Sequence, residues 1–168
     1  MTQQLHEQLR ATGQVEWFLF INRQIMSEGS SANIITAYGQ QMYWERGASV
    51  PDYPSAPTGM RLGTGDEPAT YSGAGAAIDT YLAGTAQALS VAPASTMPDD
   101  NRRVTYQCTW LPGVGTGLIS EAVLTNENPL SDIPGIDANT IARVVFAEPL
   151  NKGSLNGLTI IWHHTLGS

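Results

Sequence analysis

The sequence contains very little lysine, very little cysteine and few charged residues overall. Lys152 is the only lysine, and eight basic residues against fifteen acidic ones give a formal net charge of −7. A protein that binds nucleic acid or an anionic membrane surface needs a surplus of basic side chains, so neither partner is expected. The single cysteine, Cys108, excludes an intramolecular disulfide.

Long hydrophobic runs are also missing. No run approaches the roughly 18 apolar residues that a membrane helix needs. Residues Met1 to Gln4 do not form the basic region that precedes the apolar stretch of a signal peptide. We therefore expect a protein that is made in a cytoplasm and carries no export signal.

Turn-forming residues, in contrast, are frequent. The chain has 17 glycines and 10 prolines in 168 residues, a composition that suits a β-rich fold with many turns. This length predicts a single domain. The polar, glutamine-rich residues 1–13 are expected to form an N-terminal arm, and residues 14–168 the domain itself.

Several segments have the pattern of β-strands. Val15–Ile21 is dense in aromatic and β-branched residues, and Arg103–Leu111 alternates apolar and polar side chains, as a half-buried strand does. Further strands are expected near Gln24–Ser27, Met60–Gly65, Leu118–Leu124, Thr140–Ala147 and Leu158–Leu166. The sequence thus predicts a mainly β fold, an antiparallel β-sandwich of jelly-roll type.

One or two short helices are expected in the N-terminal half. The spacing of Ile34, Ile35, Tyr38 and Met42 predicts a helix over 31–46, capped by Ser31 and ended by Gly47. A shorter helix is expected over 76–82.

The glycine-rich segments do not form a nucleotide-binding motif. Gly63 and Gly65, like Gly73 and Gly75, lack the third glycine of a dinucleotide fingerprint, and Lys152 lacks the spaced glycine of a phosphate loop. The glycines are interpreted as turn residues, and no cofactor is expected.

No residue pattern indicates catalysis or metal binding. His163 and His164 are neighbours in a predicted strand and point to opposite faces, so they cannot share a metal ion. Cys108 lies on the apolar face of its strand and is expected to be buried. No serine lies in a G-x-S-x-G motif, and the acidic pairs Asp66–Glu67 and Asp99–Asp100 lack the spacing of a calcium loop. We expect a protein that is not an enzyme.

The order of several short motifs resembles a family of small structural proteins of tailed bacteriophages. The motifs are MRLGTG (60–65), GAGAAIDTYL (73–82), SEAVL (120–124), IARVVF (141–146), PLNK (149–152) and LTIIW (158–162). With the strand and helix that precede these motifs, the resemblance covers roughly residues 14–166.

This resemblance implies a place in the virion, on the outer capsid surface rather than in the tail. It implies a capsid cement or decoration protein that forms a homotrimer, binds the major capsid protein of the same phage and stabilises the lattice. The residues that we expect to contact partners are in the arm, in the proline-rich loop 47–58 and in the first and last strands: Leu5, Leu9, Trp17, Pro51, Tyr53, Pro54, Pro57, Trp162 and His164.

Three alternatives remain open at this point. The protein could be a tail, baseplate or fibre-adaptor component with the same fold. It could be a receptor- or glycan-binding module, which requires an exposed Trp or Tyr in a groove; three of the four tryptophans, all but Trp44, lie in strand patterns. A small hydrolase is the third, and the lack of a clustered polar motif argues against it.

Overall fold

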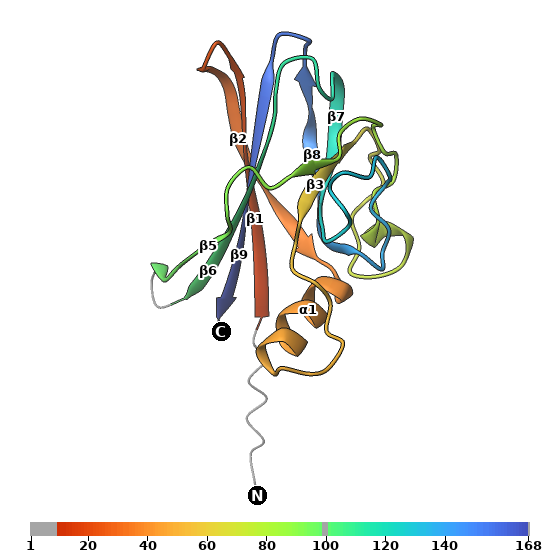
Figure 1. Ribbon diagram of the computed structural model, residues 1–168. Coiled ribbons are helices and arrows are strands. Elements are labelled where there is room, and N and C mark those ends of the chain that lie inside the picture. Colours follow the sequence, from red (N-terminus) through yellow and green to blue (C-terminus); the bar gives the residue numbers. More distant parts are fainter. Residues whose placement is uncertain (1–9, 99–100, 168) are drawn as a thin grey trace, which may run out of the picture.

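In a computed structural model of the protein, residues 10–98 and 101–167 are described. They form one antiparallel sheet of nine strands, one α-helix and one short 3₁₀ turn (Figure 1). The elements are β1 (Arg10–Ile21), β2 (Gln24–Ile35), α1 (Ala37–Gly47), β3 (Gly59–Gly63), η1 (Ala74–Ala76), β4 (Gln87–Ala88), β5 (Ala94–Thr96), β6 (Arg102–Trp110), β7 (Gly117–Thr125), β8 (Thr140–Lys152) and β9 (Gly157–Gly167).

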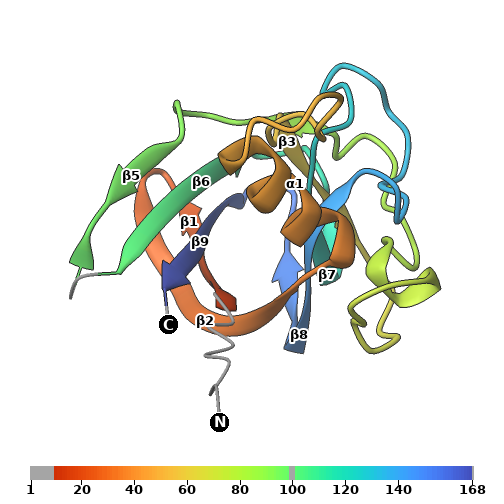
Figure 2. The same cartoon turned by 90° about the horizontal axis from the view of Figure 1, so that it is seen from below.

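The sheet curls around a single core. The strand order is β4-β3-β7-β8-β2-β1-β9-β6-β5, so β2 and β8 join two halves of the sheet that face each other. Near the other edge, the Ser90 amide donates to the Gln107 carbonyl of β6, which brings the segment after β4 against the opposite half. Figure 2 shows this curvature from the end that α1 covers.

Apolar side chains from both halves fill the core. Trp110 and Trp162 come from β6 and β9, whereas Leu124 and Ile141 come from β7 and β8, and all four are fully buried. The mainly β, antiparallel prediction is confirmed. The sandwich or jelly-roll arrangement is not confirmed, because hydrogen bonds link all nine strands into one sheet.

β6, β7 and β9 agree with the sequence-based prediction, but β1, β2 and β8 are longer than expected; β8 ends at Lys152 and not at Ala147. β1 begins at Arg10, so residues 10–13 belong to the sheet and not to the predicted arm 1–13. β2 continues to Ile35, well past the predicted end at Ser27. The two strands form a long hairpin whose turn residues, Asn22 and Arg23, both have positive φ. This conformation matches the right-handed twist of a hairpin.

The predicted helix over 31–46 is wrong at its start. Ile34 and Ile35 pair with Arg143 and Ala142 of β8, which keeps them in strand conformation. Thr36, not Ser31, is the N-cap, and its hydroxyl accepts a hydrogen bond from the Gly39 amide. The helical spacing of Ile34 and Ile35 was therefore overridden by pairing with a distant strand.

The predicted helix over 76–82 is also wrong. Only Ala74–Ala76 forms a 3₁₀ turn. The amides of Asp79 and Thr80 donate to the Glu121 carboxylate, and the Leu82 amide donates to the Leu62 carbonyl of β3. These amides are bound to the sheet and are not available to a helix.

Candidate functional site

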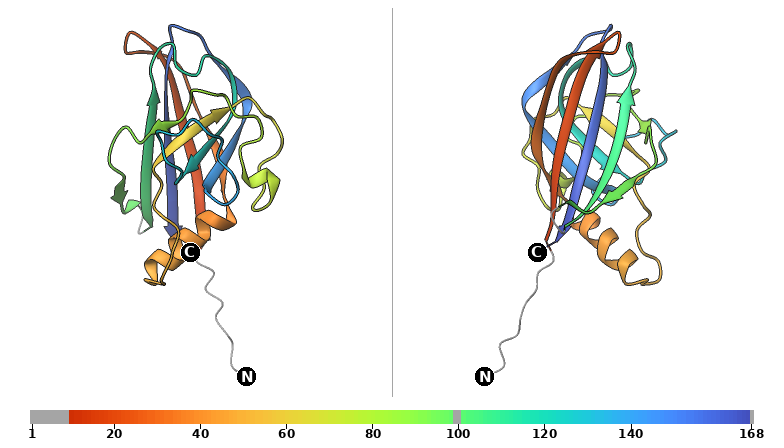
Figure 3. Two further views of the ribbon diagram at one scale, coloured as in Figure 1. Left: turned by 45° about the vertical axis from the view of Figure 1, so that its right-hand side comes forward. Right: turned by 90° about the vertical axis from the view of Figure 1, so that its left-hand side faces the viewer.

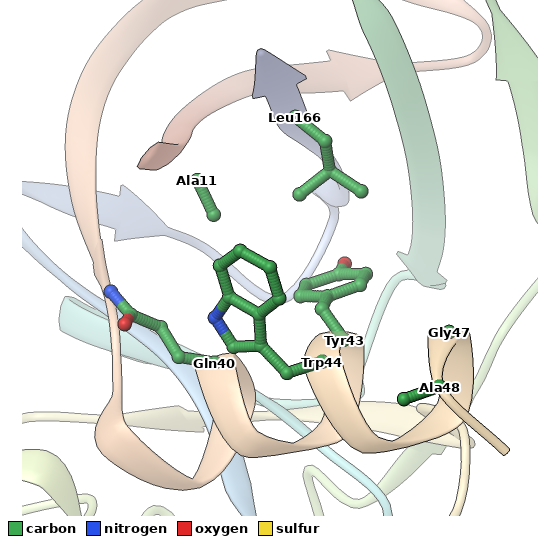
Figure 4. Close-up of a pocket in the computed structure, with 7 residues that line it drawn as sticks. All are labelled: Ala11, Gln40, Tyr43, Trp44, Gly47, Ala48 and Leu166. Atoms are coloured by element: carbon green, nitrogen blue, oxygen red, sulfur yellow. The ribbon is translucent and has the colours of Figure 1, made fainter. Parts of the chain in front are cut away.

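An apolar groove lies between α1 and the ends of β1 and β9. It measures about 400 Å³ and is lined by Ala11, Gln40, Tyr43, Trp44, Gly47, Ala48 and Leu166 (Figure 4). Ala11 and Leu166 are cross-strand partners, so together they form the wall opposite the helix. Among the lining residues that the structure describes, Gln40 and Tyr43 are the only polar ones.

The position of α1 creates this groove. Gly39 lies so close to β8 that an added Cβ would come within 2.0 Å of the Ile141 carbonyl oxygen, so glycine permits the contact. Met42 is buried beneath the helix, and Tyr43 and Trp44 project toward Ala11 and Leu166 (Figure 4). Trp44 remains 48% exposed. Tryptophan has the largest apolar side chain, and this degree of exposure is unusual for it in an isolated chain.

A chain of polar side chains lies below the groove. The Tyr43 hydroxyl is 2.6 Å from Nδ1 of His164 and 3.0 Å from the Tyr106 hydroxyl. His164 is fully buried, and burial lowers its pKa to about 3, so its ring is neutral. Nε2 of His164 is buried and has no hydrogen-bond partner in the described residues, so the ring proton is assigned to Nδ1, which donates to the Tyr43 hydroxyl. The Tyr43 hydroxyl in turn donates to the Tyr106 hydroxyl. Burial raises the pKa of both tyrosines, so this chain holds no charge and fixes the floor of the groove.

The loop after α1 continues the edge of the groove, and it is the loop that the sequence predicts to contact a partner. Gly47 and Ala48 line the groove, and the Arg46 guanidinium lies 4.9 Å from the centre of the Tyr53 ring. Pro51 and Tyr53 are exposed, whereas Pro54 and Pro57 are buried and serve to anchor the loop.

The other expected contact residues are dispersed. Trp162 and His164 are fully buried inside one chain, so that face of the last strand is core and cannot touch a partner. Trp17 is half-buried at the opposite end of the sheet's inner face. Leu5 and Leu9 lie outside the described residues.

Sequence reasoning did not single out Trp44, the one tryptophan among the described residues with a largely exposed side chain. The available signal was its position, because it is the one tryptophan outside a strand pattern. Its exposure depends on how α1 lies across the sheet end, which periodicity does not reveal.

Four charged side chains are fully buried, and each makes contacts within the fold. Glu121 and Arg143 form an ion pair with 2.9 Å between carboxylate and guanidinium, and Glu121 also accepts from three loop amides. Arg61 donates to carbonyls of the loop after β7, and Lys152 donates to the carbonyls of Leu111 and Asn156. These residues connect loops to the sheet and do not face a groove.

No group of three or more His, Cys, Asp or Glu residues that could hold a metal ion occurs in residues 10–98 and 101–167. Cys108 is buried as predicted, and burial raises the pKa of its thiol to about 12, so it is not a thiolate at neutral pH. No helix within these ranges is long and apolar enough to cross a membrane.

Comparisons with known proteins add no family assignment. No family model matches the chain, and no curated protein or solved structure is found to be similar to it.

Proposed function

We propose that the protein is a non-enzymatic structural protein of a tailed-phage particle. It binds the major capsid protein on the outer surface of the head and stabilises the assembled lattice. The observation that carries the proposal is the apolar groove with the half-exposed Trp44, flanked by the exposed Pro51 and Tyr53. A groove of this kind suits an apolar segment of another protein, since aromatic anchors in pockets provide much of the binding energy of interfaces.

The motifs that resemble phage structural proteins support this proposal in an indirect way. Four of these motifs each contain one fully buried charged side chain that connects a loop to the sheet: Arg61, Glu121, Arg143 and Lys152. The motifs therefore specify a scaffold rather than a reaction site, as is expected for a protein whose role is attachment.

Co-sedimentation with purified phage heads that lack this protein tests the proposal. Trp44→Ser should weaken binding about 30-fold, because truncating a central aromatic anchor costs about 2 kcal/mol. Leu130→Ser is the matched control: Leu130 is 91% exposed, lies in the loop after β7 and should not affect binding. Equal binding by both variants and the wild type would place the contact elsewhere, and no binding by any of them would favour the tail alternative.

A glycan-binding module is a second candidate, since a half-exposed tryptophan in a groove can also stack on a sugar ring. Sugar recognition needs several hydrogen-bonding groups around the ring. In the groove, Gln40 offers its amide nitrogen and Trp44 its indole N–H, whereas Oε1 of Gln40 accepts from the Tyr71 hydroxyl and the Tyr43 hydroxyl is bound to His164. These two donors are too few to surround a sugar ring. A glycan array distinguishes the two: retention of a glycan by the wild type and not by Trp44→Ser would favour this candidate.

A further inference from the structure

β2 has an open edge along most of its length. Its pairing with β8 is limited to Ile34 and Ile35, at the end near α1. From Gln24 to Asn33 it pairs with β1 alone, and no strand of the described residues adjoins its other side. In Figure 1, β2 and β8 diverge from their paired ends toward the turns. Alternate residues of this ten-residue stretch thus direct unpaired backbone groups toward another strand.

A groove of about 370 Å³ fills the space between the two diverging strands. Its lining combines the inner face of β1 with the edges of β2 and β8: Trp17, Leu19, Met26, Ser27, Glu148, Pro149, Leu150, Asn151 and Asn156. The inner face of β2 carries only small side chains opposite β1, with Gly29 beside Trp17 and Ser27 beside Leu19. Apolar surface of β1 is therefore left accessible beside an open strand edge.

The β8 side of this groove is blocked as a pairing edge. Pro149 has no amide hydrogen, and the register with β7 jumps from Ile119–Leu150 to Glu121–Val145, so β8 bulges there. Proline and bulges are devices that protect strand edges from pairing. β2 has no proline between Gln24 and Asn33, and Glu28 is its only charged residue there. Its one register shift skips Met26, beside the turn, so the stretch from Ser27 to Asn33 is regular. β2 is thus the edge that can accept a strand.

We propose that residues 1–9 of a second copy of this chain add to β2 as an extra strand. Nine extended residues span about 30 Å, which matches the length of the open edge. Leu5 and Leu9 share one face of an extended segment. In the proposed complex this face would lie over the surface of Trp17 and Leu19 that lines the groove.

The donor is another copy because of where the segment begins. β1 starts at Arg10, at the end of the molecule where β2 and β8 are hydrogen-bonded together, whereas the groove opens toward the opposite end. Donation from copy to copy is a head-to-tail contact, and such contacts form a ring when the rotation between copies closes. A three-membered ring agrees with the trimer implied by the proposed function, but the inference does not depend on capsid binding.

Light scattering on the full-length chain provides the first test. The wild type should have about three times the 18.0 kDa mass of one chain, and Leu5→Asp/Leu9→Asp should have the mass of a monomer. Gln4→Asp/Gln8→Asp introduces the same charge on the opposite face and should remain a trimer. A monomeric wild type, or equal masses for the two double variants, would overturn the proposal.

Disulfide trapping provides the second test, and Cys108 does not interfere because it is buried. A chain with Leu5→Cys, mixed with a chain of different length that carries Met26→Cys, should form a mixed disulfide dimer. Met97→Cys is the matched acceptor control: Met26 is 60% and Met97 59% exposed, but Met97 follows β5, at the far end of the strand order from the groove. Equal trapping with both acceptors, trapping with neither, or a disulfide within one chain of Leu5→Cys/Met26→Cys overturns the proposal. Binding to phage heads is measured separately. A negative result for the contact between copies therefore does not contradict the proposed function.

Discussion

At the scale of single residues, His164 makes stability depend on pH. Its pKa in the folded protein is about 3, below the usual 6.5, because burial disfavours the charged ring. As the pH falls below 6.5, the unfolded state binds a proton before the folded state does. Stability is therefore complete above pH 6.5 and is lost as the pH falls toward 3. The expected loss is about 2 kcal/mol between pH 6.5 and 5.

Denaturant unfolding at a series of pH values measures this effect. His164→Gln keeps a polar side chain but cannot titrate, so its stability should change by about 2 kcal/mol less than that of the wild type over the same interval. His163 is the control, since it lies on the outer face of the same strand, near Glu16 and Thr105. If His163→Gln flattens the profile and His164→Gln does not, His164 is not the titrating group.

The buried charges show what a sequence reveals at this scale. The motifs around Arg61, Glu121, Arg143 and Lys152 could be recognised, but not the burial of these side chains, because charged residues are almost always exposed. Each is buried only because atoms distant in sequence satisfy it. Arg61, for example, bonds to carbonyls about 70 residues later, at Asn128, Ser131 and Ile133.

At the scale of elements, Glu121 holds the glycine-rich segment 64–82 against the sheet. Its carboxylate accepts from Arg143 and from the amides of Gly65, Asp79 and Thr80. Glu121→Gln would leave the Arg143 cation without its partner, which typically costs about 3–5 kcal/mol. We expect this variant to unfold at lower denaturant concentration and to be cleaved faster by chymotrypsin after the exposed Tyr71.

The control for this prediction is Glu45→Gln, which removes an exposed carboxylate from α1 and should change neither quantity. Replacing both partners, as in Glu121→Leu/Arg143→Met, should not restore stability as it does for many buried ion pairs. The three loop amides would then lack an acceptor. A double variant as stable as the wild type would show that segment 64–82 does not need the hydrogen bonds to Glu121.

The accuracy of the element predictions depended on where each strand finds its partner. β6, β7 and β9 were predicted within about two residues, since each has a clear local pattern and is buried on its inner face. β2 was predicted too short because small polar residues occupy both of its faces, which leaves no hydrophobic alternation to detect. Its conformation is imposed by the partner β1.

At the scale of the whole molecule, both candidate surfaces result from the curl of the sheet. The α1 groove exists because the helix crosses one end of the curled sheet, and the β2 edge is open because β2 and β8 diverge toward the other end (Figures 2 and 3). Neither feature is local in sequence. For this reason the sequence predicts that some aromatic residues contact a partner but does not identify which ones. Trp162 was predicted to contact a partner, although it lies in the core.

A decoration protein must stabilise the head as well as bind to it, and this requirement yields a quantitative prediction. A ligand that binds only the assembled lattice stabilises each site by RT ln(1+[L]/Kd), about 1.4 kcal/mol at ten times Kd and about 2.7 kcal/mol at one hundred times Kd. Heads titrated with the protein should therefore release their DNA at temperatures that keep rising after the sites are nearly filled. Trp44→Ser should give the same rise, displaced to higher concentration by its loss in affinity. A release temperature that does not change while sedimentation shows full occupancy would mean that the protein attaches to the head without stabilising it.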